Sequence, residues 1–361
     1  MRGNPHYTAI RRTKEIAVYQ IFSKSMMLLC IVLPVVIFGT GYKEAVIGWG
    51  IANFMTFLAA MYMKNKPYRK IDTEAIPDMY RTVFNYSLPL TGAFIAGFFV
   101  NSADQFFVSR YYGTQVFAEF SNGCLSIPIV GMIAVSVKSV LLPLFSKADA
   151  NHDLDSATQS YGNAVRSTAI IVIPMLIFCL FFAQDIMVAL FGRQYQDSES
   201  FFRMYIIRDF LQIFPYFAVL MALGYSKLYM HLHVIGAIFI WTADFIIVSL
   251  AGPAPSIVLI SSIFHSSCTV AALIYIYKKT SISLIPASLA RFIMTVIVHC
   301  SVCVAILFCA RLYLWPTMNV FASIAICGIM FYLIIISTGR LLRIDYVESV
   351  KRLIASRYVR K

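Results

Sequence analysis

The chain has 361 residues, of which 60% are hydrophobic and 13% are charged, and its mean hydropathy is +0.75. An ordinary globular domain is about half apolar and about a quarter charged, so a soluble core could not bury this much apolar surface. The formal net charge of +13 would suit a nucleic-acid partner, but the basic residues lie between the apolar stretches. Composition therefore favours a membrane protein, and we expect no nucleic-acid partner.

Apolar stretches of about 20 residues, the length that crosses a hydrocarbon core of about 30 Å, recur along most of the chain. They lack the period-two alternation of barrel strands, and backbone groups in lipid must be paired within the segment. We therefore predict an all-α fold, a polytopic membrane helical bundle of about ten transmembrane helices. The expected spans are 16–39, 44–63, 84–106, 115–144, 165–190, 202–225, 229–250, 254–277, 289–312 and 318–338.

Lysine and arginine are distributed unevenly between the two sides of these spans. With the N-terminus in the cytoplasm, 22 of the 30 basic residues fall on the inner side, five on the outer side and three within spans. This asymmetry is what the positive-inside rule expects. We predict a multi-pass protein of the bacterial inner (plasma) membrane with both termini in the cytoplasm.

The longest polar interruption between spans is the segment from Lys64 to Arg81, which predicts a cytoplasmic linker. The tail after Ser337 combines basic residues with an apolar stripe at helical spacing, which favours a helix on the anionic membrane surface over a partner-binding helix. The expected divisions are 1–63 with two helices, 64–82 as the linker, 83–277 with six helices, 278–338 with two more helices, and 339–361 as the basic amphipathic tail.

Ionisable residues inside spans are rare, and each costs about 3 kcal/mol or more at the bilayer centre, so each one is a functional hypothesis. The spans contain Lys24, Asp104, Lys138, Asp185, Arg208, Asp209, Asp244 and His265. If 202–225 and 229–250 form an antiparallel hairpin, Arg208 and Asp244 lie at similar depth, because a helix rises about 1.5 Å per residue. We predict an ion pair between them, which would serve either helix packing or transport.

Six of these residues are candidates for a substrate-binding cavity. Lysine makes charge-assisted contacts with phosphate, so Lys24 and Lys138 would suit an anionic substrate such as a lipid pyrophosphate. For Lys138 the alternative is snorkelling toward the inner headgroups. The candidates are Lys24, Lys138, Arg208, Asp209, Asp244 and Asp104.

No pattern in the sequence predicts a metal site or a catalytic site. The eight cysteines fall in apolar segments, and His231 and His233 lie on different faces of a helix, so we expect no metal and no cofactor. We find no nucleophile elbow, phosphate loop or zinc-protease motif, and we expect no enzymatic activity.

A resemblance to a known family begins at Phe84, in the run FNYSLPLTGAFIAGFFVNSADQFFVSRYYGTQVFAEFSNG. This run resembles the start of the second lobe in polysaccharide flippases of the Wzx type, which belong to the MATE-like MOP superfamily. The matching positions are Tyr86, Ser87, Pro89, Asp104 and Gly113. Two further matches are VLLPLFSK at 140–147 and the Phe191, Gly192 and Tyr195 of a Leu-Phe-Gly-x-x-Tyr pattern. The similarity covers about 64–277 and rests on many weak positions.

The resemblance implies two lobes of helices around a central cavity, which carry undecaprenyl-pyrophosphate-linked sugars across the membrane by alternating access. It predicts a flippase for lipid-linked oligosaccharide in surface-polysaccharide (O-antigen, lipopolysaccharide) biosynthesis. The implied partners are that substrate, membrane lipids and other polysaccharide-assembly membrane proteins. The family's first lobe has six helices, whereas two precede the linker here. We therefore expect an incomplete first lobe, as in a chain shortened at its N-terminus.

Two other functions stay open at this point. A cation-coupled multidrug exporter of the same superfamily could use Asp104 and Asp244 as proton or sodium sites. A membrane polysaccharide polymerase or glycosyltransferase is favoured less, because such enzymes need a sizeable extracytoplasmic loop and every predicted outer loop is short.

Overall fold

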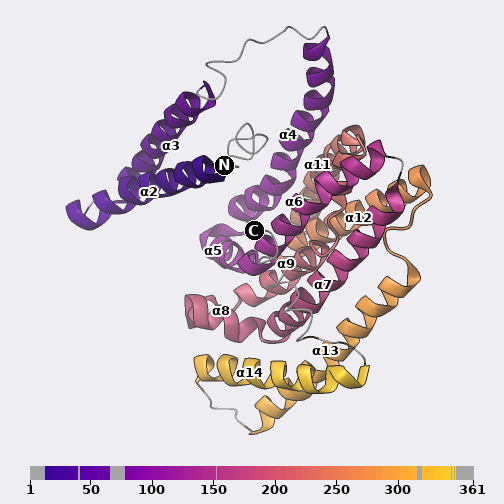
Figure 1. Cartoon of the computed structure of the whole chain (residues 1–361). Helices are drawn as coiled ribbons and strands as arrows, with labels where there is room; N and C mark the ends of the chain where they lie inside the picture. Colours follow the sequence, from indigo (N-terminus) through magenta and orange to yellow (C-terminus); the bar gives the residue numbers. More distant parts are fainter. Residues whose placement is uncertain are drawn as a thin grey trace. The chain divides into compact units, whose positions relative to one another are not determined.

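The computed structural model describes residues 13–39, 41–65, 78–151, 153–314, 319–342, 344 and 346 (Figure 1). These residues form helices and connections, with no strand among them. The α-helices are α2 (Thr13–Phe38), α3 (Tyr42–Asn65), α4 (Met79–Tyr111), α5 (Gly113–Gly123), α6 (Pro128–Ala150), α7 (Leu154–Phe181), α8 (Ala183–Phe191), α9 (Ser198–Leu211), α10 (Tyr216–Ala222), α11 (Ser226–Ser249), α12 (Pro255–Thr280), α13 (Ala287–Leu314) and α14 (Val320–Gly339). Two short 3₁₀ helices are η2 (Arg193–Tyr195) and η3 (Arg340–Leu342).

Within this part of the chain, nine helices are long and apolar enough to cross a membrane. Helices α9 and α10 would make a tenth span if they cross together, and they are bent by 40° at the break between them. The predicted polytopic helical bundle is confirmed, and the expected number of about ten spans agrees with the count that includes the bent pair.

Three predicted spans were wrong in being drawn as continuous helices. The span 115–144 is divided between α5 and α6, because Pro128 has no backbone N–H and starts a new helix at its first turn. The span 165–190 is divided at Phe182 between α7 and α8, and α7 already begins at Leu154. The span 202–225 is broken before Pro215, which precedes α10. Hydropathy alone did not reveal these breaks, since apolar residues continue across each of them.

One break explains a motif singled out from the sequence. Helix α8 ends at Phe191, and the next residue, Gly192, has φ +92°. A side chain at this angle would be strained, so the turn favours glycine. The rings of Phe191 and Tyr195 then lie edge to face with centroids 6.5 Å apart. The Phe-Gly-x-x-Tyr spacing therefore builds one compact turn.

The chain forms two compact units, Met1–Met79 and Tyr80–Lys361. In the first unit α2 and α3 pack along each other as a hairpin. The approach is close at Gly48, where a Cβ atom would lie 2.0 Å from the backbone oxygen of Cys30. Tyr19 donates a hydrogen bond to the carbonyl of Thr56 (3.3 Å). Small residues at such crossings let the backbones of membrane helices approach closely.

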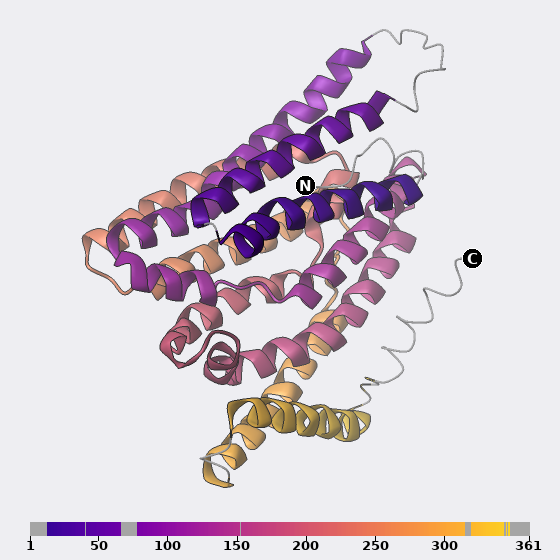
Figure 2. The ribbon, with the colours of Figure 1, turned by 90° about the vertical axis from the view of Figure 1, so that its left-hand side faces the viewer.

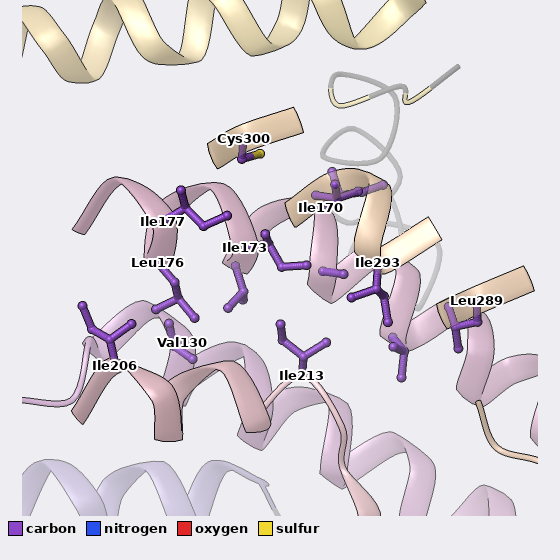
Figure 3. Packing of buried hydrophobic residues seen from close by; sticks show 14 of the residues in the cluster. Val130, Ile170, Ile173, Leu176, Ile177, Ile206, Ile213, Leu289, Ile293 and Cys300 are labelled. Carbon is purple, nitrogen blue, oxygen red and sulfur yellow. The ribbon is translucent and has the colours of Figure 1, made fainter. Parts of the chain in front are cut away.

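The second unit is organised around α7, the most buried of its long helices. Its side chains Ile173, Leu176 and Ile177 lie between Ile206 of α9 on one side and Cys300 of α13 on the other (Figure 3). The second half of α7, from Ala169 to Phe181, is apolar on all sides, a pattern that fits either contact with lipid or the interior of a bundle. The burial of most of these residues shows that neighbouring helices cover this half of α7.

The last two helices cross each other, as both views show (Figure 1 and Figure 2). An ion pair between Arg311 of α13 and Asp185 of α8 (2.8 Å) ties them to the core, and Arg311 also donates to Ser323 of α14 (3.1 Å). At the other end of α14, His299 lies 2.8 Å from the Thr338 hydroxyl. These contacts therefore join α13 to α8 and α14 through polar groups at both ends of α14.

We expect Gly48→Ala to destabilise the α2–α3 hairpin by about 1–3 kcal/mol, because the added methyl group meets backbone that cannot rotate away. The matched control is Gly50→Ala on the same helix, where no atom lies within 4 Å of the added Cβ. Heating the purified protein in detergent and measuring the fraction that stays monodisperse would compare them. Equal curves for the two variants would contradict the close approach.

Candidate functional site

A cluster of polar side chains lies inside the second unit, among four helices of the bundle. Helix α4 supplies Asp104, α9 supplies Arg208, α11 supplies Asp244 and α12 supplies His265. Asp104 is 5% exposed and Asp244 is fully buried. Charged groups at such positions are costly within a membrane and mark functional sites in general. Three of the four, all except His265, belong to the six substrate candidates predicted from the sequence.

Arg208 is held by neutral partners. Its Nη2 donates to Oδ1 of Asn101 and to Nε2 of His265, each at 3.1 Å. Its guanidinium also lies over the ring of Tyr205, 4.9 Å from the centroid. Stacking on an aromatic face and hydrogen bonding at the edge are both available to the planar guanidinium but not to a lysine ammonium. The site therefore selects arginine at this position.

The hydrogen bonds also determine the protonation state of His265. Its Nδ1 lies 2.8 Å from the carbonyl oxygen of Ser261, so Nδ1 carries the proton. Nε2 then accepts from Arg208 and the ring is neutral, because an imidazolium has no acceptor nitrogen. His265 therefore orients Arg208 and leaves the positive charge of the guanidinium in place.

The two carboxyl groups of the cluster have different surroundings. Asp104 accepts a hydrogen bond from the Ser261 hydroxyl, which links α4 to α12. Neither carboxylate oxygen of Asp244 has a hydrogen-bond partner among the residues that the structure describes. The two groups lie within electrostatic range of each other. A buried carboxyl without a partner is stable only when it is neutral or when a cation binds to it.

The predicted ion pair between Arg208 and Asp244 was wrong. Arg208 contacts Asn101 and His265, and Asp244 is without a partner in the described chain. The depth estimate assumed one straight helix from 202 to 225. The real path breaks after Leu211 and bends by 40°, so residues along it rise less than the 1.5 Å per residue of a continuous helix.

Asp209, the next residue, faces a different element. Its Oδ2 accepts from the backbone N–H of Ile127 (3.2 Å), and its Oδ1 accepts from the Ser126 hydroxyl (3.3 Å) and the Gln212 amide (2.7 Å). Ile127 is the N-cap residue of α6, so this carboxylate stabilises the positive end of the helix. Asp209 is 1% exposed. Asp209, which the sequence predicted as a cavity residue, therefore stabilises the start of α6 and the break after α9.

The two lysine candidates belong to helices other than the four that form the cluster. Lys24 is exposed on α2 in the first unit, and Lys138 is half-buried on α6 in the second. The hydrogen-bonding residues Asn101 and Ser261 were missed by the sequence analysis. Their signal was an amide and a hydroxyl within otherwise apolar spans, which is weak because such residues are common in membrane helices.

The described cysteines and acidic residues do not form a metal site. All eight cysteines are free, and no group of three or more metal-binding side chains occurs in the part of the chain that the structure describes. Cys300 and Cys303 each lie near a hydroxyl, that of Tyr346 and that of Thr338 respectively.

The architecture defines a class, that of multi-pass helical membrane proteins with ionisable side chains inside the bundle. The comparisons with known proteins narrow this class. Residues 9–200, more than half of the chain, match the family model described as polysaccharide biosynthesis protein, and the chain belongs to that family. No curated protein and no solved structure matches the chain. The matched region spans α2 to α8 and includes Asp104 but none of the other three members of the cluster.

We expect Asp209→Asn to lower the free energy of unfolding by about 1–3 kcal/mol, because an amide cannot accept all the hydrogen bonds that the carboxylate accepts. The matched control is Asp197→Asn at the N-cap of α9, where the exposed side chain makes no capping hydrogen bond. Thermal unfolding of the detergent-purified variants measures the difference. If Asp209→Asn and Asp197→Asn unfold at the same temperature, the capping role of Asp209 is excluded.

Proposed function

We propose that this chain is a flippase that carries lipid-linked oligosaccharide across a membrane for the synthesis of surface polysaccharide. Its membership of the polysaccharide biosynthesis family supports the pathway, and its multi-pass helices support a transport role. The resemblance to Wzx-type, MATE-like flippases from Phe84 onward supports the particular activity. On this proposal the protein is a carrier and not an enzyme.

The observation that carries the proposal is the setting of Arg208. Its guanidinium is half-buried within the bundle, and among the described side chains no carboxylate lies within ion-pair distance of it. A fixed positive charge that is not neutralised by direct contact is suited to bind a pyrophosphate, since arginine binds phosphate oxygens in a bidentate manner. We assign Arg208 to the pyrophosphate of the substrate, with His265 and Asn101 as its positioning residues.

Further features of the proposal follow from the charge asymmetry and the resemblance. The carrier lipid is undecaprenol, the membrane is the bacterial inner membrane, and both termini are cytoplasmic. The substrate crosses by alternating access between two lobes, and membrane lipids and other polysaccharide-assembly proteins are the partners. The short connections at the outer end, such as Gly192–Asp197 and Leu250–Ala254, support a carrier over a polymerase that needs a large outer loop.

Complementation in a strain that lacks its flippase tests this proposal. The protein, expressed from its native gene, should restore surface polysaccharide. Arg208→Ala should reduce it by about tenfold or more, since a hydrogen-bonded charge contributes about 1.5–3 kcal/mol. The control Arg203→Ala, on the same helix and paired with Glu199 at 3.1 Å, should leave it nearly unchanged.

Membrane levels of each variant must be measured by immunoblot, so that a loss of transport is separated from a loss of protein. If the unaltered protein reaches the membrane and surface polysaccharide is still absent, the proposal is wrong. Equal polysaccharide levels for Arg208→Ala and Arg203→Ala would remove Arg208 from the substrate site.

A second candidate function is cation-coupled export of small molecules, and the unpartnered carboxyl of Asp244 near Asp104 is the observation that favours it. Membrane vesicles distinguish the two functions. Dye efflux that is driven by a proton or sodium gradient and abolished in Asp244→Asn would support the exporter. A gradient without effect on dye movement would count against it.

A further inference from the structure

A cavity of about 470 Å³ opens in the second unit beside the turn between α10 and α11. It is lined by Asn85 of α4, by residues 224–228 of the turn and the start of α11, and by Tyr275 of α12. Its volume lies within the range of small-molecule sites, about 300–1,000 Å³. The cavity is separate from the Arg208 cluster, since they share no lining residue.

The cavity lies at the basic end of the bundle, which we define by Lys147, Lys227, Lys278, Lys279 and Arg291. These five residues belong to the end of α6, the start of α11, the end of α12 and the start of α13. Lys227 lines the cavity directly, and Lys279 lies 6.0 Å from the ring centroid of Tyr275, another lining residue. Two lysine residues are therefore adjacent to the cavity.

The start of α11 adds hydrogen-bond donors. The first bond of the helix runs from the N–H of Tyr229 to the carbonyl of Tyr225 (3.4 Å), so the N–H groups of residues 226–228 precede it. Ser226 also lines the cavity, and the residue is only 4% exposed. Its hydroxyl has no hydrogen-bond partner among the described residues, so it is a group that a ligand in the cavity can satisfy.

Two tyrosines and an asparagine contribute to the walls of the cavity. The rings of Tyr225 and Tyr275 meet edge to face with centroids 5.3 Å apart, and Asn85 adds an amide on the α4 side. Asp149 at the end of α6 acts electrostatically on Tyr225 but does not line the cavity. The lining therefore contains donors and one positive charge, and no carboxylate.

We propose that this cavity binds a phosphate group, with Lys227 as the counter-ion and with the Ser226 hydroxyl and the first N–H groups of α11 as donors. Helix N-termini with a neighbouring ammonium group bind phosphate oxygens through both hydrogen bonds and the helix dipole. Two sources supply this chemistry, an anionic lipid headgroup or a free diphosphate. The role of the site rests on the proposed function. In a flippase, this cavity would be the first place at the basic end of the bundle where the lipid-linked pyrophosphate binds.

Binding to the purified full chain in nanodiscs tests this proposal. One arm uses phosphatidylcholine nanodiscs and titrates inorganic pyrophosphate by calorimetry. The other arm adds phosphatidylglycerol to the nanodiscs and counts retained lipid by native mass spectrometry. Lys227→Ala should weaken the binding of whichever ligand occupies the site, pyrophosphate or phosphatidylglycerol, by about tenfold. This change corresponds to about 1.4 kcal/mol of binding free energy.

Two further variants make the result specific. Lys147→Ala removes an exposed lysine at the same end that does not line the cavity, and it should change binding by less than about twofold. Asn85→Trp leaves both ammonium groups in place and fills the cavity from its exposed α4 side, so it should weaken binding as Lys227→Ala does.

The outcomes separate the site from the proposed function. If neither pyrophosphate nor phosphatidylglycerol binds more weakly to Lys227→Ala than to Lys147→Ala, the phosphate site is wrong, even if complementation succeeds. If Lys227→Ala and Asn85→Trp both lose binding while complementation by the unaltered protein fails, the site stands and the flippase proposal falls.

Discussion

Hydrogen-bonding groups inside a bilayer must find their partners within the protein, because lipid tails offer none. The second unit meets this requirement at several of its helix breaks and crossings. The N-terminus of α6 is satisfied by the carboxylate of Asp209, and the guanidinium of Arg311 reaches both α8 and α14. These contacts join elements far apart in the chain. The packing of the bundle is therefore constrained by a few polar contacts in addition to the apolar core around α7.

Asp244 does not meet this requirement. Its neighbours in the structure leave both of its oxygens without a hydrogen bond, whereas Asp104 has Ser261. Adjacent residues on α9 show a related division of roles. Asp209 faces inward and supports the helix break, and Arg208 is held at a half-buried position by neutral groups. A single turn of helix thus combines a structural residue with a candidate binding residue.

Much of the fold could be predicted from the sequence, because long apolar runs leave helices as the choice once barrel alternation is absent. The breaks were harder to predict. Pro128 and Pro215 were visible as prolines within apolar runs, but prolines also occur in membrane helices that continue, and only tertiary contacts such as Asp209 with Ile127 show where a helix stops. The candidate site was predicted in part. Arg208, Asp104 and Asp244 were predicted as candidates, but their hydrogen-bond partners were not. The sequence gives the depth of a residue along a span, but not the direction in which its side chain points around the helix axis.

The hydroxyl of Tyr112, just beyond α4, donates to the carbonyl of Gly252 between α11 and α12 (2.6 Å), and Trp241 of α11 donates to the carbonyl of Phe99 (3.0 Å). Phe99 precedes Asp104 along the chain and Tyr112 follows it, so the two hydrogen bonds lie on either side of this carboxyl group. Trp241 is one turn before Asp244 on α11. The two hydrogen bonds therefore hold the segment of α4 that carries Asp104 against the part of the chain that carries Asp244.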